Sequence, residues 1–292
     1  MDDSTLSPTF LQSLTAEDIE LFPNELKLEF EKYIERRNMS NIAFSKVKLP
    51  DCTREDGLNL NVDNVAMFRG PTIHLPADCA SPAPSEALVV QLHRVCQVWR
   101  LSNEKARRML IDAILTEVLF FQASENLIGH CEVENDWMKS NGAKYTGVTD
   151  YMLGTGNQPE SLDTFVLVVE AKKDWSESAV AQVLCEVGCL LKRRVMVGKN
   201  TPVFACLTNG SFFQFFAVDV QGVVYSSNEL VLVRGGTGSF ADSPSLIEIL
   251  RWFHWFISCM TAVSPRVGRM DLDPEEINSA CTEIEKCFGP RP

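Results

Sequence analysis

The sequence predicts a mixed α/β fold in which helices pack against one β-sheet. The chain has 292 residues, of which 45% are hydrophobic and 23% are charged, and this composition is typical of a folded chain with a substantial core. Helical and strand-like patterns alternate through its centre in the order helix, three strands, helix, and two or more strands. No internal repeat or low-complexity tract interrupts this order.

Residues 1–85 are predicted to form an accessory region of helical and extended segments. A helical pattern covers residues 15–37 and is divided by Pro23, and mixed sequence with short extended pieces follows it. The later segment "ADCASPAPSE" is rich in proline, serine and alanine, which is typical of a surface connection. We therefore place a domain boundary near Ser85.

Residues 86–240 contain the predicted core. Two helices come first, and Ser102 is positioned to cap the second of them. Asp174 and Glu177 have the spacing of a capping box at the start of a later helix. The first elements of the core are expected over residues 86–99 and 103–122 as helices, 127–134, 145–153 and 164–172 as strands, and 175–194 as a helix.

Further strands and two helices complete the predicted fold. Asn209 and Gly210 form a hairpin turn signal between two apolar runs. Residues 241–292 are predicted to pack on the core as helices, and the more apolar helix contains Glu248 and Arg251, which argues against a membrane span. The last elements are expected over residues 202–208, 212–219, 222–226 and 229–234 as strands, and 244–262 and 273–287 as helices.

The composition limits the compartment and the partners. The ten cysteines include no CxxC pair and there are only four histidines, so the spacing of a zinc site is absent. Several cysteines lie in apolar stretches, and the acidic N-terminus lacks the apolar segment of a signal peptide. These observations predict an intracellular protein, in the cytoplasm or nucleus, with no membrane partner. The net charge of −12 requires any nucleic-acid binding to come from a local patch or from bound metal ions.

The strongest functional signal is the end of the strand "FVLVVEAK", residues 165–172. Alternate side chains share a face of a strand, and both faces of this one are apolar as far as Glu170. The strand is therefore expected to be central in the sheet. Its charged end places Glu170 and Lys172 on the same face at one rim. An acid and a base at this position are costly to bury unless something pairs with them.

Asp150 is the predicted partner of Glu170. It lies in the preceding strand among apolar neighbours, and the connection between the two strands is short enough for an antiparallel pair. Directly opposed residues have Cβ atoms about 5 Å apart, so the two carboxylates would share a proton or a cation. Oxygen ligands favour Mg²⁺ or Mn²⁺. We therefore expect Asp150 and Glu170 to bind the metal, and Lys172 to orient the nucleophile or stabilise negative charge.

The helix over residues 103–122 offers a third carboxylate. Glu117 continues an apolar stripe at helical spacing, whereas Asp112 lies on the polar face with Lys105 and Arg108. A glutamate on a buried face needs a partner. We expect Glu117 to assist the metal directly or through water, and the alternative is an ion pair with a buried arginine or lysine.

Together these residues resemble the PD-(D/E)XK nuclease superfamily. Asp150 followed by Glu170-Ala171-Lys172 is similar to its motif, with Thr149 where the motif has proline. "VVEAKKD", a helix containing "AQVL", and "VFACLTNGSFFQFF" are similar to a recurring arrangement in which a helix glutamine, here Gln182, faces the site. The resemblance covers about residues 100–235, and domains of Crinkler-type effectors of oomycetes and fungi share it.

This resemblance implies a restriction-endonuclease-like mixed β-sheet flanked by helices, an αβββαβ core with N-terminal and C-terminal helical additions. It also implies a metal-dependent nuclease that uses Mg²⁺ or Mn²⁺ and hydrolyses nucleic-acid phosphodiester bonds, with DNA as the expected substrate. Asp150, Glu170, Lys172, Gln182 and Glu117 would then be its catalytic residues.

Four cations near the motif are candidates for phosphate contacts. The functional interpretation is a nucleic-acid-binding surface. The alternative for those at the end of the helix is a favourable interaction with the helix dipole. The candidates are Lys173, Lys192, Arg193 and Arg194.

Two alternatives stay open at this point. The Glu170–Lys172 pair is also typical of a solvated, salt-bridged strand end. The chain is also compatible with an inactive nuclease-like interaction module, or an effector that is secreted and acts inside a host cell. Such a module would bind a protein or a nucleic acid, with residues 1–85 as a possible protein-binding region.

Overall fold

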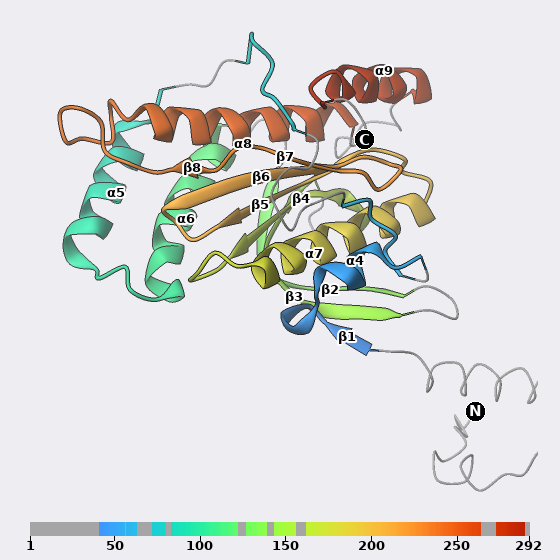
Figure 1. Ribbon diagram of the computed structural model, residues 1–292. Helices are drawn as coiled ribbons and strands as arrows, with labels where there is room; N and C mark the ends of the chain where they lie inside the picture. Colours follow the sequence, from blue (N-terminus) through green and yellow to red (C-terminus); the bar gives the residue numbers. More distant parts are fainter. Residues whose placement is uncertain are drawn as a thin grey trace, which may run out of the picture.

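One mixed β-sheet of eight strands organises the molecule (Figure 1). The structure is a computed structural model, and it describes residues 41–55, 57–62, 72–79, 83–121, 127–138, 143–155, 162–263 and 273–289. The helix predicted over residues 15–37 lies outside these ranges. The predicted mixed α/β class is confirmed, because the described residues form an open mixed sheet flanked by helices.

The element bounds follow the predicted order closely from residue 86 onward. The strands are β1 (Asn41–Ala43), β2 (Ile128–Met138), β3 (Lys144–Gly154), β4 (Phe165–Ala171), β5 (Val203–Thr208), β6 (Phe212–Val218), β7 (Val224–Ser226) and β8 (Leu230–Val231). The helices are α4 (Leu49–Thr53), α5 (Glu86–Val98), α6 (Glu104–Phe121), α7 (Glu177–Met196), α8 (Pro244–Val263) and α9 (Pro274–Glu285), with 3-10 turns η1 (Phe44–Lys46) and η4 (Leu162–Thr164).

The topology places β4 in the interior of the sheet. β2, β3 and β4 form an antiparallel meander, and α7 then crosses over so that β5 pairs in parallel with β4. β5 and β6 form the predicted hairpin, in which Gly210 has a φ of 79°. A left-handed backbone at this turn favours glycine. Every residue of β4 is buried, as expected for a central strand.

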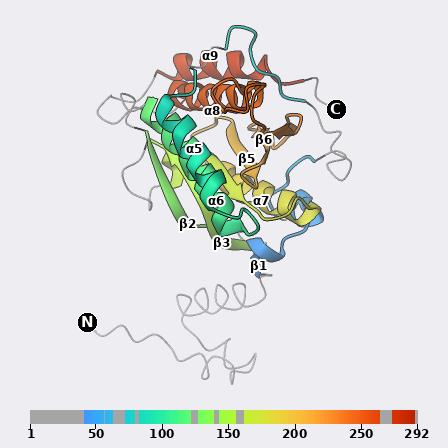
Figure 2. The ribbon, with the colours of Figure 1, turned by 90° about the vertical axis from the view of Figure 1, so that its left-hand side faces the viewer.

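Helices cover both faces of the sheet. Figures 1 and 2 show α8 on one side and α7, with α4, on the other. The alternation within β5 reflects this arrangement, because Phe204 stacks on Phe256 of α8 at 4.4 Å between ring centroids while Ala205 belongs to the core beneath α7. Since successive strand residues face opposite sides, each strand contributes to both cores.

Helix α8 is the apolar C-terminal helix of the sequence analysis. Among the described residues it is the helix that is long and apolar enough to cross a membrane by length and composition. However, 67% of its most apolar window is buried within the protein. Stacking of Trp252 on Phe215, with ring centroids 5.2 Å apart, anchors it to β6. In this fold α8 is therefore a core helix.

The predicted N-terminal boundary does not separate two cores. β1 pairs in parallel with β3, and Cys52 and Leu60 lie in the same buried cluster as α7. The described part of residues 1–85 therefore belongs to the packed unit. The reason is geometric, since β3 is longer than β4 and leaves an edge that β1 occupies.

Two helix caps differ from their predictions. Asn103, rather than Ser102, caps α6, because its Oδ1 accepts a hydrogen bond from the Ala106 N–H at 2.8 Å. Ser176, rather than Asp174, caps α7, because its Oγ accepts from the Ala179 N–H at 3.2 Å. In both cases the cap is the residue immediately before the first helical turn, from which a short side chain reaches the free N–H groups.

Candidate functional site

Asp150 and Glu170 meet at one rim of the sheet. The ladder between β3 and β4 pairs Tyr151 with Val169, so the next position along it places Asp150 across from Glu170, as predicted. The N–H of Ala171 donates to Asp150 Oδ2 at 2.8 Å, which fixes this carboxylate against the end of β4. The two residues are only 8% and 1% exposed, respectively.

A chain of polar contacts surrounds Glu170. Lys172 Nζ lies 2.5 Å from Glu170 Oε1, and Gln182 Nε2 donates to the same oxygen at 2.7 Å. The Gln182 amide also donates to Glu186 Oε1 at 2.9 Å, so one side chain bridges two carboxyl groups. The second oxygens, Oε2 of Glu170 and of Glu186, are buried without a hydrogen-bond partner in the described part of the chain.

Helix α7 brings Gln182 and Glu186 to this position. The helix begins shortly after the end of β4 and is buried along most of its length. Residues four apart lie on the same helical face, so both side chains point at the rim. The predicted placement of Gln182 is confirmed. Glu186 was missed, although its spacing of four from Gln182 was visible in the sequence.

Burial dominates the electrostatics of the three carboxyl groups. It raises the pKa of Glu170 to about 7, with the charge of Asp150 adding to the rise and Lys172 opposing it. Burial and the charge of Glu170 raise the pKa of Glu186. Burial also raises the pKa of Asp150, against the opposing Ala171 N–H and Arg108. The site therefore favours a proton or a bound cation over full ionisation.

The charge of Lys172 is retained at the rim. Burial lowers the pKa of Lys172, but the charge and hydrogen bond of Glu170 and the charges of Asp150 and Glu186 together outweigh burial, so the net pKa is raised. Its side chain remains about one quarter exposed, at 28%. Lys172 is thus a charged group that contacts both the buried carboxylate and the solvent.

Helix α6 contributes Arg108 to the site. Its guanidinium forms an ion pair with Asp150 and a second with Glu104 at 3.2 Å. Glu132 on β2 lies 3.8 Å from the same group. Three carboxylates thus share one guanidinium. The sequence analysis assigned Arg108 to the polar face of α6, and that face is turned toward the rim.

Glu117 does not join the other predicted ligands. It is buried as expected, but its two oxygens accept hydrogen bonds from the N–H and Oγ of Ser85, each at 2.7 Å. The predicted metal role and the alternative arginine or lysine partner are both wrong. The free polar groups at the start of α5 satisfy this carboxylate instead.

The cations that were predicted to contact phosphate lie in different environments. Arg194 is fully buried and donates to the carbonyl of Phe165 at 3.1 Å and to Thr201 Oγ1 at 2.8 Å, so its predicted phosphate role is wrong. The Arg194 guanidinium lies on the inner side of the C-terminal end of α7, where it binds neighbouring segments of the chain and does not face solvent. Lys173 is exposed beside Asp174, and Lys192 is partly exposed on α7.

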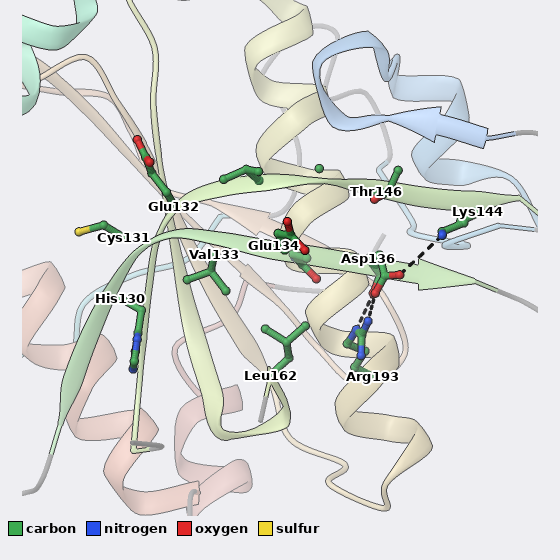
Figure 3. A pocket seen from close by; sticks show the side chains of 13 residues that line it. His130, Cys131, Glu132, Val133, Glu134, Asp136, Lys144, Thr146, Leu162 and Arg193 are labelled. Carbon is green, nitrogen blue, oxygen red and sulfur yellow. Dashed lines mark hydrogen bonds and ion pairs between the residues drawn. The ribbon is translucent and has the colours of Figure 1, made fainter. Parts of the chain in front are cut away.

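Arg193 is held by an acid at a groove along β2. The groove has a volume of about 780 Å³, and Figure 3 shows Asp136 between Arg193 and Lys144. Arg193 pairs with the Asp136 carboxylate, and its Nε donates to the Asp136 carbonyl at 2.5 Å. Neither Asp150 nor Glu170 lines this groove.

A second and larger cleft adjoins Asp150. Its volume is about 1010 Å³, and its lining includes Asp150 and Tyr151 of β3 and Arg108 of α6. The connection between α5 and α6, including Trp99, forms another part of its lining. This cleft gives a substrate access to Asp150, which makes it the candidate substrate site.

The donor set fits a hard divalent cation with few protein ligands. In the ranges that the structure describes, no group of three or more histidine, cysteine, aspartate or glutamate side chains is placed to hold a metal ion. Asp150 and Glu170 supply oxygen donors, and the buried Glu170 Oε2 has no hydrogen-bond partner among the described residues. Mg²⁺ characteristically binds through one or two carboxylates and keeps several waters or phosphate oxygens.

Comparison with protein-family models finds no family that matches this chain, and comparison with curated proteins finds no similar protein.

Proposed function

We propose that this protein is a metal-dependent nuclease that hydrolyses phosphodiester bonds, with DNA as the expected substrate. The observation that carries the proposal is the arrangement around Glu170. Its carboxylate contacts Lys172 and Gln182, and Asp150 lies across from it on the neighbouring strand. Two acids and a lysine at one rim of the sheet combine cation ligands with a group that stabilises negative charge.

The order of elements supports the same proposal. α6, β2, β3, β4, α7 and β5 follow one another, with an antiparallel meander and a parallel crossover. This order resembles the αβββαβ core of the PD-(D/E)XK superfamily. A restriction-endonuclease-like fold is therefore part of the proposal.

Each side chain has a separate role in the proposed reaction. Asp150 and Glu170 would hold Mg²⁺ or Mn²⁺, which when bound lowers the pKa of water and neutralises charge on a phosphate. Lys172 orients the attacking water and stabilises the negative charge that develops on the phosphate. Gln182 holds the Glu170 carboxylate in place through its 2.7 Å hydrogen bond. Arg108 lines the cleft and can donate hydrogen bonds to a phosphate there.

A second candidate is a nuclease-like binding module that does not cleave. Arg108 forms an ion pair with the Asp150 carboxylate, to which a metal would bind, and the chain carries a net charge of −12. The ion pair favours a site neutralised by a protein cation, and the acidic net charge disfavours cleavage of a polyanion. The two candidates differ in metal dependence, since only the nuclease requires a divalent ion.

The test is a cleavage assay on the purified full chain. Plasmid DNA, single-stranded DNA and RNA are each incubated with Mg²⁺, Mn²⁺ or EDTA. The nuclease proposal predicts cleavage of at least one substrate that EDTA and Glu170→Ala both abolish. Cleavage that survives Glu170→Ala would place the activity elsewhere, and a folded protein that cleaves none of them would favour the binding module.

A further inference from the structure

The cleft beside Asp150 has one wall that the proposed chemistry does not use. That wall is the connection between α5 and α6, and Trp99 stands at its start. The Trp99 side chain is 53% exposed and lines the cleft. A large aromatic ring is usually mostly buried, so an exposed ring in the same cleft as the candidate metal ligand Asp150 needs an explanation.

This wall is fixed relative to the catalytic rim. Arg107 Nε donates to the Leu101 carbonyl at 2.8 Å, and the same guanidinium donates to the Lys173 carbonyl at 2.8 Å. One side chain therefore joins the connection that carries Trp99 to the turn that follows Lys172. The connection that carries Trp99 is therefore tied to the chain beside Glu170 and Lys172.

The charges of the cleft suit a phosphodiester strand. Arg100 and Lys105 are exposed at the cleft and have no ion-pair partner within the ranges described above. Glu104, Glu132 and Asp150 instead share the guanidinium of Arg108. With Asp112, which also lines the cleft, these acids and one guanidinium leave an excess of three negative charges, of which a divalent cation neutralises two. Arg100 and Lys105 then remain as cations for phosphate groups.

We propose that this cleft binds an unpaired nucleotide, with its base stacked on Trp99 and its phosphates toward Arg100 and Lys105. The inference rests on the proposed nuclease function and specifies its substrate as a single-stranded or locally unpaired nucleic acid. Bases inside a duplex are stacked on each other, so an aromatic side chain reaches a base face only where the strand is open.

The test measures binding separately from cleavage. Fluorescein-labelled dT12 and a 12-base-pair duplex are titrated with full-length protein in Mg²⁺, using Lys172→Ala as the non-cleaving parent, and anisotropy is recorded. Added to this parent, Trp99→Ala should weaken dT12 binding about tenfold or more, as expected for loss of one stacking contact. Trp99→Phe should retain most of the affinity. Phe120→Ala removes an aromatic ring that is 74% exposed outside the cleft and should change nothing.

The outcomes distinguish this inference from the proposed function. Equal dT12 affinity in Trp99→Ala and its parent, or a parent that prefers the duplex, would overturn the inference even if the native chain cleaves DNA. A native chain that cleaves no substrate, combined with Trp99-dependent dT12 binding, would overturn the nuclease proposal and leave the unpaired-nucleotide site standing.

Discussion

The guanidinium of Arg108 on α6 forms an ion pair with the carboxylate of Asp150 on β3. Asp150 is also the residue across the ladder from Glu170, so a protein cation and a metal ion would compete for the same oxygen atoms. Glu104 and Glu132 lie within 4 Å of the same guanidinium and offer it alternative acceptors. Arg108 can therefore leave Asp150 without losing all its partners.

Removal of Arg108 should strengthen metal binding. In Arg108→Ala the Asp150 carboxylate loses its competing cation, and we expect the Kd for Mn²⁺ to fall several-fold in a titration followed by electron paramagnetic resonance. Lys105→Ala is the matched control, because it removes one charge from the same helix without an ion pair to Asp150. Equal effects of the two variants would show that only long-range charge matters.

Gln182 should contribute to stability through the two carboxyl groups that it bridges. Gln182→Ala leaves buried acceptors on Glu170 and Glu186 without their shared donor. We expect the free energy of unfolding in urea to fall by about 1–3 kcal/mol. Gln97→Ala, on the exposed face of α5, is the control and should change it by less than about 0.5 kcal/mol. A loss of the same size in both variants would contradict the bridging role.

Stability should decrease as the pH rises through the neutral range. The folded-state pKa values of Glu170 and Glu186 are raised, so the folded protein holds protons that the unfolded chain releases near pH 4.5. This contribution to the free energy of unfolding is fully present below that pH. It is lost as the pH rises through the folded-state pKa, which is about 7 for Glu170. One pKa unit corresponds to about 1.4 kcal/mol, so the effect amounts to a few kcal/mol.

Glu186→Gln isolates part of this effect. The variant cannot ionise at this position, so it should be about as stable as the native chain at pH 5 and more stable at pH 8. Urea unfolding at the two pH values measures the difference. A stability difference between variant and native chain that is the same at both pH values would exclude a buried, titrating Glu186.

Glu117 should affect stability and leave metal binding unchanged. Glu117→Ala removes both hydrogen bonds to Ser85 at the start of α5, and we expect a loss of about 1–3 kcal/mol in the free energy of unfolding. The Kd for Mn²⁺ should stay at the native value. Weaker Mn²⁺ binding in this variant would restore Glu117 as a metal ligand.

Local pattern was sufficient to predict much of the fold and the centre of the site. The apolar run that ends at Glu170 identified a central strand, and a short connection identified its antiparallel neighbour. The position of Asp150 across from Glu170 followed from these two features. Gln182 followed from the resemblance of its helix to a known arrangement.

The remaining contacts depend on how distant segments pack, which periodicity does not specify. Glu117 lies on a buried face as the α6 pattern indicates, but the identity of its partner depends on where α5 begins. Arg108 lies on a polar face, and only the position of α6 beside β3 turns that face toward Asp150. Arg194 was predicted to contact phosphate from its place in a run of cations, yet the inner side of the α7 end is enclosed by the chain around Phe165.

The most direct test of the proposed chemistry compares two adjacent lysines. Lys172 contacts Glu170, whereas the exposed Lys173 lies beside Asp174. Single-turnover cleavage of plasmid, single-stranded DNA and RNA is measured in Mg²⁺ and in Mn²⁺ for Lys172→Ala, Lys173→Ala and the native chain. We predict that Lys172→Ala abolishes metal-dependent cleavage and that Lys173→Ala retains it within about tenfold, because one phosphate contact affects binding more than chemistry. Cleavage by Lys172→Ala at the native rate, or no cleavage by the native chain, would contradict a nuclease site at Asp150, Glu170 and Lys172.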